Sequence, residues 1–282
     1  MGTGGLTGVS KTAILTLRAR ADEHERADRF FEDPWARDWI ARIEWPPELD
    51  AWYSARAQHF LAARADELDG LARAHLSAHP DGRVLELGAG LSSRSLRLEH
   101  EFERARFLDL DLEPVIELRR SLAGESERRR HIGASVTELG WLEAFESEDP
   151  RALLIIAEGL FYYLPRAEVL GAFDALGAKL QGASVAFDVV GEMDFPETSA
   201  RASAVGAGLA WMHESPFERA WTDFCLDEVP GFGPAELMER AIDRYWARLG
   251  SPTRELVRAL SRSPALAGGR SGVVYGTLRA RR

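Results

Sequence analysis

The chain has 282 residues, 45% of them hydrophobic, and a formal net charge of -10. This length and hydrophobic content suffice for one large or two small domains, and the negative charge argues against a groove for nucleic acid. Cys225 is the only cysteine, so the sequence offers neither an internal disulfide nor a thiolate cluster for a metal.

The start of the chain gives no sign of export. Residues 1–10 lack the basic beginning and the apolar core of a signal peptide. No apolar run anywhere approaches the roughly 18 residues that a membrane-spanning helix needs. We therefore expect a cytoplasmic protein that associates with neither membrane nor nucleic acid.

The first 80 residues are predicted to be mostly helical. Their apolar residues recur at helical spacing, with helices expected over 12–27, 35–43 and 52–78. Asp33 and the proline after it separate the first two helices, and Arg56 lies near the start of the third. We expect residues 1–80 to form a helical cap over the site that follows.

The stretch Arg83–Arg94 (RVLELGAGLSSR) has the pattern strand, glycine turn, helix that opens a nucleotide-binding α/β fold. Gly88 and Gly90 permit a tight turn and a close approach of the backbone to a ligand. A dinucleotide fingerprint has a third glycine where this chain has Ser93, and its turn faces a pyrophosphate. Glu86, within the strand end, suits a cationic ligand better than a phosphate. The stretch therefore favours S-adenosylmethionine (SAM), although a ligand-free glycine turn is the alternative.

A second strand is expected over residues 105–111, followed by a helix over 114–122. Asp111 ends this strand a little over 20 residues after the first glycine. Such folds place an acid there to hold the ribose hydroxyls. Asp109 competes for the role, but Asp111 is favoured because the chain turns into the helix directly after it.

Two more strands complete the predicted ligand edge. A short third strand and loop are expected over residues 131–137, where Ser135 could form a hydrogen bond with adenine. Residues 152–157 are a continuous apolar run, typical of a central parallel strand that is buried on both faces. Glu158 follows directly, and a polar residue in that place faces the ligand crevice of an open α/β sheet.

The rest of the chain continues the alternation. We expect a helix over 166–180, a strand over 183–190, an irregular insertion at about 191–220, a strand over 221–229, a helix over 234–248 and a last, antiparallel strand over 272–278. The predicted fold is an α/β, Rossmann-like, seven-stranded and mostly parallel sheet with an antiparallel last strand. The N-terminal helical cap precedes this core, which spans residues 81–282.

Several segments match one family pattern in order along the chain. They are residues 9–13, 28–36, 52–56, 87–94, 109–114, 133–136 with Trp141, and 157–164, the last reading AEGLFYYL. Together they resemble the leucine carboxyl methyltransferase superfamily of class I SAM-dependent methyltransferases. The resemblance is strongest to the bacterial branch named for the tetracenomycin polyketide O-methyltransferase. The chain departs from this pattern in two places. Ser92 replaces the aspartate that the family has in the glycine loop. The family's usual aspartate after the third strand is also absent, and Ser135 in that loop can form only a neutral hydrogen bond.

The resemblance implies roles for single residues. Arg56 and Arg94 would bind the methionine carboxylate of SAM through paired charge-assisted hydrogen bonds, with Arg20 as a further candidate. Glu158 would accept from the ammonium group or from backbone near the sulfonium, and Tyr163 would line the donor pocket. With the residues singled out above, the expected cofactor-binding set is Arg20, Arg56, Glu86, Gly88, Gly90, Arg94, Asp109, Asp111, Ser135, Glu158, Gly159 and Tyr163. No metal site is expected.

Methyl transfer from SAM requires mainly that the enzyme align the acceptor with the methyl group and exclude water. A hydroxyl acceptor can also need a general base, for which His213 in the 191–220 insertion is the candidate. We expect an O-methyltransferase that acts on a hydroxyl or carboxyl of a small molecule, a polyketide or other secondary metabolite. The expected assembly is a monomer or homodimer.

Three alternatives remain at this point. One is a carboxyl methyltransferase that acts on a protein C-terminus or a small acid. Another is a SAM-binding partner or regulatory protein without turnover. Nicotinamide-dependent reduction is the third, and the missing third glycine disfavours it.

Overall fold

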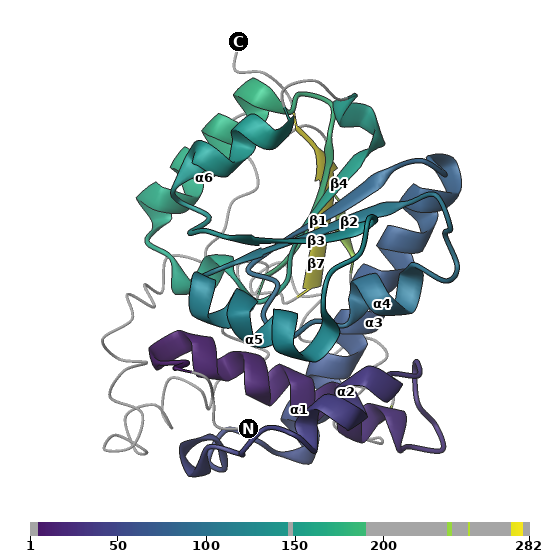
Figure 1. Ribbon diagram of the computed structural model, residues 1–282, viewed down its shortest axis with the longest axis vertical. Coiled ribbons are helices and arrows are strands. Elements are labelled where there is room, and N and C mark those ends of the chain that lie inside the picture. The colour runs from purple at the N-terminus through teal and green to yellow at the C-terminus, as the bar shows by residue number, and fades with distance from the viewer. Residues whose placement is uncertain (1–4, 146–148, 190–235, 239–247, 249–271, 279–282) are drawn as a thin grey trace, which may run out of the picture.

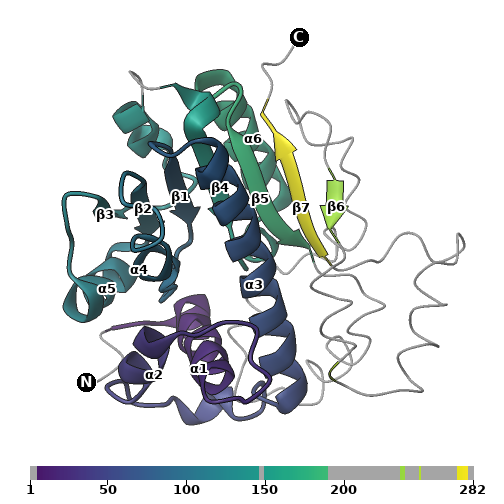
Figure 2. The same cartoon turned by 90° about the vertical axis from the view of Figure 1, so that its right-hand side faces the viewer.

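The computed structural model describes residues 5–145, 149–189, 236–238, 248 and 272–278. Within them, seven strands form one sheet with helices against both faces (Figures 1 and 2). The strands are β1 (Arg83–Leu87), β2 (Arg106–Asp111), β3 (Arg129–Gly133), β4 (Leu153–Ala157), β5 (Ser184–Val189), β6 (Glu236–Met238) and β7 (Gly272–Thr277).

The sheet order is β3-β2-β1-β4-β5-β7-β6. The strands from β1 to β5 pair in parallel, whereas β7 is antiparallel to both β5 and β6. The predicted α/β class, the mostly parallel seven-stranded sheet and the antiparallel last strand are confirmed. The chain order reverses between β1 and β4, and ligands of open α/β sheets bind at the carboxyl ends of the strands beside such a reversal.

The helices of the described chain lie close to their predicted positions. They are α1 (Thr12–His24), α2 (Pro34–Ile40), α3 (Ala55–Ala78), α4 (Arg94–Leu98), α5 (Glu113–Ala123) and α6 (Arg166–Lys179). Short 3₁₀ helices lie at Gly8–Lys11, Pro47–Leu49, Leu139–Phe145, Pro150–Ala152 and Phe161–Tyr163. Asp33 caps α2 by accepting a hydrogen bond from the Ala36 amide, and Ser54 caps α3 in the same way through the Ala57 amide.

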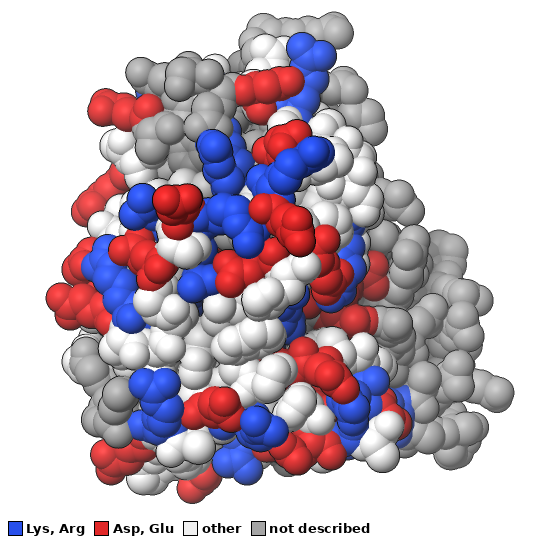
Figure 3. Space-filling view, turned by 45° about the vertical axis from the view of Figure 1, so that its right-hand side comes forward, with Lys and Arg blue, Asp and Glu red and all other residues white. Residues whose placement is uncertain are grey.

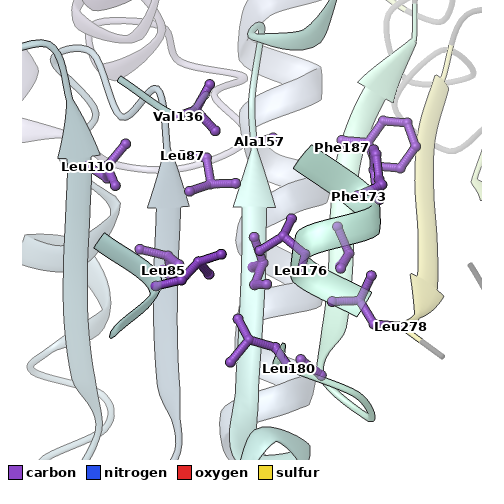
Figure 4. Packing of buried hydrophobic residues seen from close by; sticks show 14 of the residues in the cluster. Leu85, Leu87, Leu110, Val136, Ala157, Phe173, Leu176, Leu180, Phe187 and Leu278 are labelled. Atoms are coloured by element: carbon purple, nitrogen blue, oxygen red, sulfur yellow. The ribbon is translucent and has the colours of Figure 1, made fainter. Parts of the chain in front are cut away.

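The strand pleat divides the central core between two faces. Leu85, Leu87 and Ala157 point to the face that α6 covers with Phe173 and Leu176 (Figure 4). Their neighbours in β1 and β4 point the other way, because successive side chains of a strand alternate. That second face packs against α3 and α4. Every residue of β4 is buried, as the apolar run over 152–157 predicts, and every residue of β1 is buried as well.

Helix α3 belongs to both parts of the molecule. Near its start, Gln58 donates a hydrogen bond to the carbonyl of Ala19 in α1. Near its end, Leu68, Ala72 and Leu76 pack on the sheet. Figure 2 shows α3 running from the layer formed by α1 and α2 along the sheet. The division of the chain at residue 80 stays a prediction, and α3 crosses from the one part to the other.

The predicted helix over 234–248 is wrong at its start. Residues Glu236–Met238 form β6 and pair with Tyr275, Val274 and Val273 of β7. Alanine, glutamate, leucine and methionine favour a helix locally, but pairing with β7 overrides that preference. Residue 248 is helical. The predicted insertion 191–220 and the predicted strand 221–229 lie outside the described residues.

No described helix is both long enough and apolar enough to cross a bilayer. The face in Figure 3 mixes acidic and basic side chains closely and shows no single broad basic field.

Candidate functional site

A cavity of about 280 Å³ lies at the carboxyl ends of β1, β2 and β4, where the chain order of the sheet reverses. Its walls come from the glycine turn after β1, the loops after β2, β3 and β4, and the helices α1 and α3. Most of the cofactor-binding residues expected from the sequence line it: Arg20, Glu86, Gly88, Gly90, Asp111, Ser135, Glu158, Gly159 and Tyr163. The topology therefore brings together residues that are spread over more than half of the chain.

The glycine turn has the backbone geometry that its sequence requires. Gly88 and Gly90 have φ angles of 62° and 51°, in the left-handed region that side chains disfavour. A Cβ atom on Gly88 would lie 2.7 Å from Cδ1 of Leu160, and one on Gly90 would lie 3.3 Å from Cβ of Ala13. The turn is thus packed between α1 and the loop after β4, and neither glycine can be replaced without displacing a neighbour.

Asp111 lines the cavity from the end of β2. One of its carboxylate oxygens accepts from the Gly90 amide and the other from the Leu112 amide, both at 2.7 Å. Burial raises the pKa of Asp111, although these two hydrogen bonds favour the charged form. Each oxygen retains a lone pair for a ligand hydroxyl.

Asp109, two residues earlier on the same strand, does not line the cavity. Its side chain is buried and forms an ion pair with Arg119 of α5. Burial would raise the pKa of Asp109, but Arg119 and His131 together outweigh burial and lower it. Arg119 in turn donates to the carbonyls of Gly90 and Ser92. Asp109 therefore holds Arg119 against the glycine turn on the side away from the cavity, while Asp111 faces the cavity.

A buried ion-pair network forms one wall of the cavity. Glu158 accepts from Arg64 at 3.1 Å and from Arg94 at 2.7 Å. Burial would raise the pKa of Glu158, but the charges of Arg64, Arg94 and Arg20 outweigh it and lower the pKa to about 2. Arg64 also pairs with Asp188 at 2.8 Å. Glu158 is therefore an anion at neutral pH, held in place between guanidinium groups.

Arg94 forms ion pairs with carboxylates of the protein itself. Its guanidinium pairs with Asp69 and Glu158, both at 2.7 Å, and with Glu86. The side chain is only 1% exposed and is absent from the described wall of the cavity. The structure therefore places Arg94 behind Glu86 and Glu158, where it fixes two carboxylates that do line the cavity.

Glu86 has one carboxylate oxygen to spare. Its Oε1 contacts Arg94 and accepts from Ser92 at 3.3 Å. Its Oε2 is buried and has no hydrogen-bond partner among the described residues. A buried carboxylate oxygen without a partner is costly, so this atom suits a donor group brought by a ligand.

The other cationic groups of the wall come from α1 and α3. Arg20 donates to the Leu91 carbonyl at 2.5 Å and lies 3.3 Å from Asp33. Burial lowers its pKa to about 10, so it stays charged at neutral pH. Arg64 and Arg20 both line the cavity.

Sequence reasoning missed Arg64 and Asp188. Arg64 lies about two helical turns after Arg56, so both residues lie on the same face of the helix. That spacing could have identified Arg64 as a candidate site residue. Asp188 is a single acid near the end of an otherwise apolar strand, as Glu158 is after β4. Arg56 lies in the first turn of α3, but its side chain is outside the described residues, as is the whole of His213.

The remaining predicted residues line the cavity near its apolar part. Ser135 shares a hydrogen bond with Thr137 at 2.9 Å, which holds the loop after β3. Burial raises the pKa of Tyr163, whose hydroxyl group pairs with Thr12. Within the described chain, no cluster of three or more histidine, cysteine or acidic side chains could hold a metal ion.

Comparison with known proteins identifies the family of this chain. The model of the leucine carboxyl methyltransferase family matches residues 13–177. The tetracenomycin polyketide synthesis O-methyltransferase TcmP of Streptomyces glaucescens is 34% identical over 209 residues, 73% of this chain and 76% of its own length. The S-adenosyl-L-methionine-dependent methyltransferase dpfgK of Gibberella zeae is 27% identical over 265 residues, 87% of this chain and 86% of its own.

A solved structure has the same fold. It belongs to a candidate methyltransferase from Thermobifida fusca, with a TM-score of 0.51 at 13% sequence identity, and the match covers 93% of this chain and 94% of the other.

The chemistry of the cavity fits SAM. The spare oxygen of Glu86 suits its ammonium group, Arg20 and Arg64 offer charges for its carboxylate, and the glycine turn allows a close approach. The order of the sheet, the lining of the cavity and the family match agree. The chain therefore belongs to the leucine carboxyl methyltransferase family, and it is a methyltransferase whose cofactor is S-adenosylmethionine.

Proposed function

We propose that this protein is an O-methyltransferase whose acceptor is a small molecule, a polyketide or a related secondary metabolite. The observation that carries the proposal is the 34% identity to a polyketide O-methyltransferase over about three quarters of both chains, 73% of this one and 76% of the other. The acceptor atom is proposed to be a hydroxyl or carboxyl oxygen.

The proposed cofactor roles follow the polarity of the cavity wall. Asp111 would hold the ribose hydroxyls with its remaining lone pairs. The adenine would lie in the apolar part beside Leu112 and Val136, where Ser135 offers a hydrogen bond. These placements bring the adenosine end to β2 and β3, on one side of the glycine turn.

The methionine end would lie toward α1 and α3. Glu86 and Glu158 would accept from the ammonium group, while Arg20 and Arg64 would pair with the carboxylate. Arg56 stays a candidate for the same carboxylate. Arg94 would act as a positioning residue, because its guanidinium already pairs with three protein carboxylates.

SAM supplies a methyl group on a sulfonium, which is a good leaving group. The protein has to align an acceptor oxygen in line with that bond and keep water out of the site. A phenolic acceptor would also lose a proton, and His213 is the proposed base. A carboxylate acceptor needs no base.

The test is an assay of the purified chain with SAM that carries a deuterated methyl group. Aromatic polyketide phenols, small carboxylic acids and peptides ending in leucine are offered in parallel, and mass spectrometry locates the label. Labelled phenol ethers or esters of small molecules support the proposal. A labelled peptide C-terminus replaces it with protein carboxyl methylation.

Binding without turnover has its own readout. The same preparation is titrated with SAM by calorimetry. Saturable binding with no labelled product from any acceptor class would point to the non-catalytic alternative.

A further inference from the structure

We propose that Arg119 is a positioning residue for SAM, since it holds the glycine turn in its binding conformation before the cofactor arrives. This inference rests on the placement of the cofactor in the cavity beside that turn. Arg119 lies on α5, outside the cavity wall, and its side chain is 0% exposed.

One nitrogen of the Arg119 side chain serves two backbone groups of the turn. Nη1 donates to the Gly90 carbonyl at 3.0 Å and to the Ser92 carbonyl at 2.7 Å. The other terminal nitrogen, Nη2, pairs with Asp109. The planar fork of a guanidinium allows these directions at once, whereas an ammonium is a single point charge.

Other side chains complete the hold on this segment. Arg20 donates to the Leu91 carbonyl, between the two that Arg119 takes. Three successive carbonyls of the turn therefore face buried arginines. Asp111 accepts from the Gly90 amide on the other side, so the backbone of Gly90 is fixed through both its amide and its carbonyl.

Strand β2 contributes to this arrangement twice. Asp109 and Asp111 are two residues apart, so they lie on the same face of the strand. Asp111 reaches the turn directly, and Asp109 reaches it through Arg119. Asp109 also accepts a hydrogen bond from the Ser95 hydroxyl group of α4 at 3.4 Å, and Nε2 of His131 in β3 lies 3.4 Å from its carboxylate.

The turn needs such a hold because of its glycines. Gly88 and Gly90 sample many backbone conformations in the absence of restraint, and ordering them on binding would weaken affinity for the cofactor. Fixing the bound conformation in advance removes that penalty. The contacts of Arg119 and Arg20 thus restrict the backbone freedom of the two glycines, which are needed for the close approach of the turn to the cofactor.

The experiment compares Arg119→Lys with Arg128→Lys. Arg128 also donates to backbone carbonyls, those of Glu99 and Phe102, but it is not among the residues that line the cavity. Lysine at 119 keeps a positive charge beside Asp109 but has one terminal nitrogen, whereas the three contacts use two separate nitrogens of Arg119. We expect Arg119→Lys to raise the Kd and KM for SAM about tenfold with kcat within about twofold, a difference of about 1.4 kcal/mol in binding. Arg128→Lys should leave all three unchanged.

Several results would overturn the inference. One is a folded Arg119→Lys variant that binds SAM with the same Kd as the unaltered protein. Another is an equal loss of affinity for SAM in Arg119→Lys and Arg128→Lys. If Arg119→Lys does not fold, the double variant Asp109→Asn with Arg119→Met, which removes both buried charges, is tested in its place. Failure of that variant to fold would make Arg119 a merely structural residue. Absence of SAM binding by the unaltered protein would instead contradict the cofactor placement itself.

Discussion

Of the two glycines in the turn after β1, Gly88 has less room for a side chain than Gly90. Gly88→Ala would place a Cβ 2.7 Å from Leu160 at a φ of 62°. We expect the Kd for SAM to rise at least about tenfold, because either Leu160 or the turn must move, and the φ angle alone disfavours alanine by roughly 1–2 kcal/mol. Titration calorimetry measures the first effect and urea unfolding the second.

Gly124 provides the matched control. Its φ is 63°, but a Cβ added there would have no neighbour within 4 Å, and the residue is not among those of the cavity wall. Gly124→Ala should show only the conformational penalty, with unchanged affinity for SAM. Equal losses of affinity in the two variants would mean that the steric argument at Gly88 is mistaken.

Glu158 gives the molecule a pH dependence of known sign. Its pKa of about 2 in the folded chain lies below the ordinary value of 4.5. A depressed pKa stabilises the fold above the unfolded value and loses that contribution as the pH falls toward the folded one. The free energy of unfolding should therefore decrease between about pH 4.5 and about pH 2, by at most about 1.4 kcal/mol per pH unit from this group.

The variant Glu158→Gln isolates this contribution. Asp111 and Asp188, whose pKa values are raised by burial, act in the opposite direction and remain in both proteins. Urea unfolding of both proteins at about pH 4.5 and about pH 3 measures the slopes. The glutamine variant should show the shallower decrease, and parallel slopes would count against the proposed charge state of Glu158.

Single residues also show how far the sequence could lead. Gly88, Gly90 and Asp111 could be placed at the cavity because their spacing after a buried strand fixes their position at its end. Arg94 has the same sequence signal, yet it pairs with carboxylates from three other segments. Spacing along the chain cannot show which carboxylates reach a given guanidinium, since tertiary packing decides that.

At the scale of an element, α3 contains a glycine that lowers the stability of the helix. Gly70 lies within this 24-residue helix, is exposed, and has open space within 4 Å of the position that a Cβ would take. Gly70→Ala should stabilise the fold by roughly 0.5–1 kcal/mol, because alanine loses less conformational entropy in a helix. Urea unfolding measures this gain. Affinity for SAM should not change, and a loss of stability would show that Gly70 has a packing role.

Elements were predictable wherever local pattern and tertiary environment agree. The run over 152–157 is apolar throughout, and β4 is buried on both faces. Residues 236–238 show the opposite case, because their helix-favouring side chains form the edge strand β6, which pairs with β7 35 to 39 positions later in the sequence. A prediction from a short stretch of sequence cannot detect pairing between distant segments.

At the scale of the whole molecule, one ion pair joins segments 225 positions apart. Arg248 makes a two-point contact with Glu23, at 2.7 and 2.8 Å, and its guanidinium lies over the ring of Phe30. Glu23 is 0% exposed and also accepts from Gln58 of α3. The contact therefore fastens Arg248 to the end of α1, the helix that carries Arg20.

Removing one partner of this pair should destabilise the fold. Arg248→Met would leave the Glu23 carboxylate buried without its cation, and we expect a loss of about 3 kcal/mol in the free energy of unfolding. The double variant with Glu23→Gln should recover part of that loss, since no unpaired charge remains. Urea unfolding of the four proteins forms the cycle, and strictly additive losses would argue against a direct coupling.

The course of α3 bears on how such enzymes could be recombined. Its second half supplies Leu68, Ala72 and Leu76 to the core on one face of the sheet. A chimera joined at residue 80 would therefore bring in a foreign helix against Val84 and Ile156, and we expect it to aggregate. A junction just before Ser54, the capping residue of α3, would keep that face native and exchange only the preceding helices. Chimeras with related proteins should therefore keep α3 whole, from one parent.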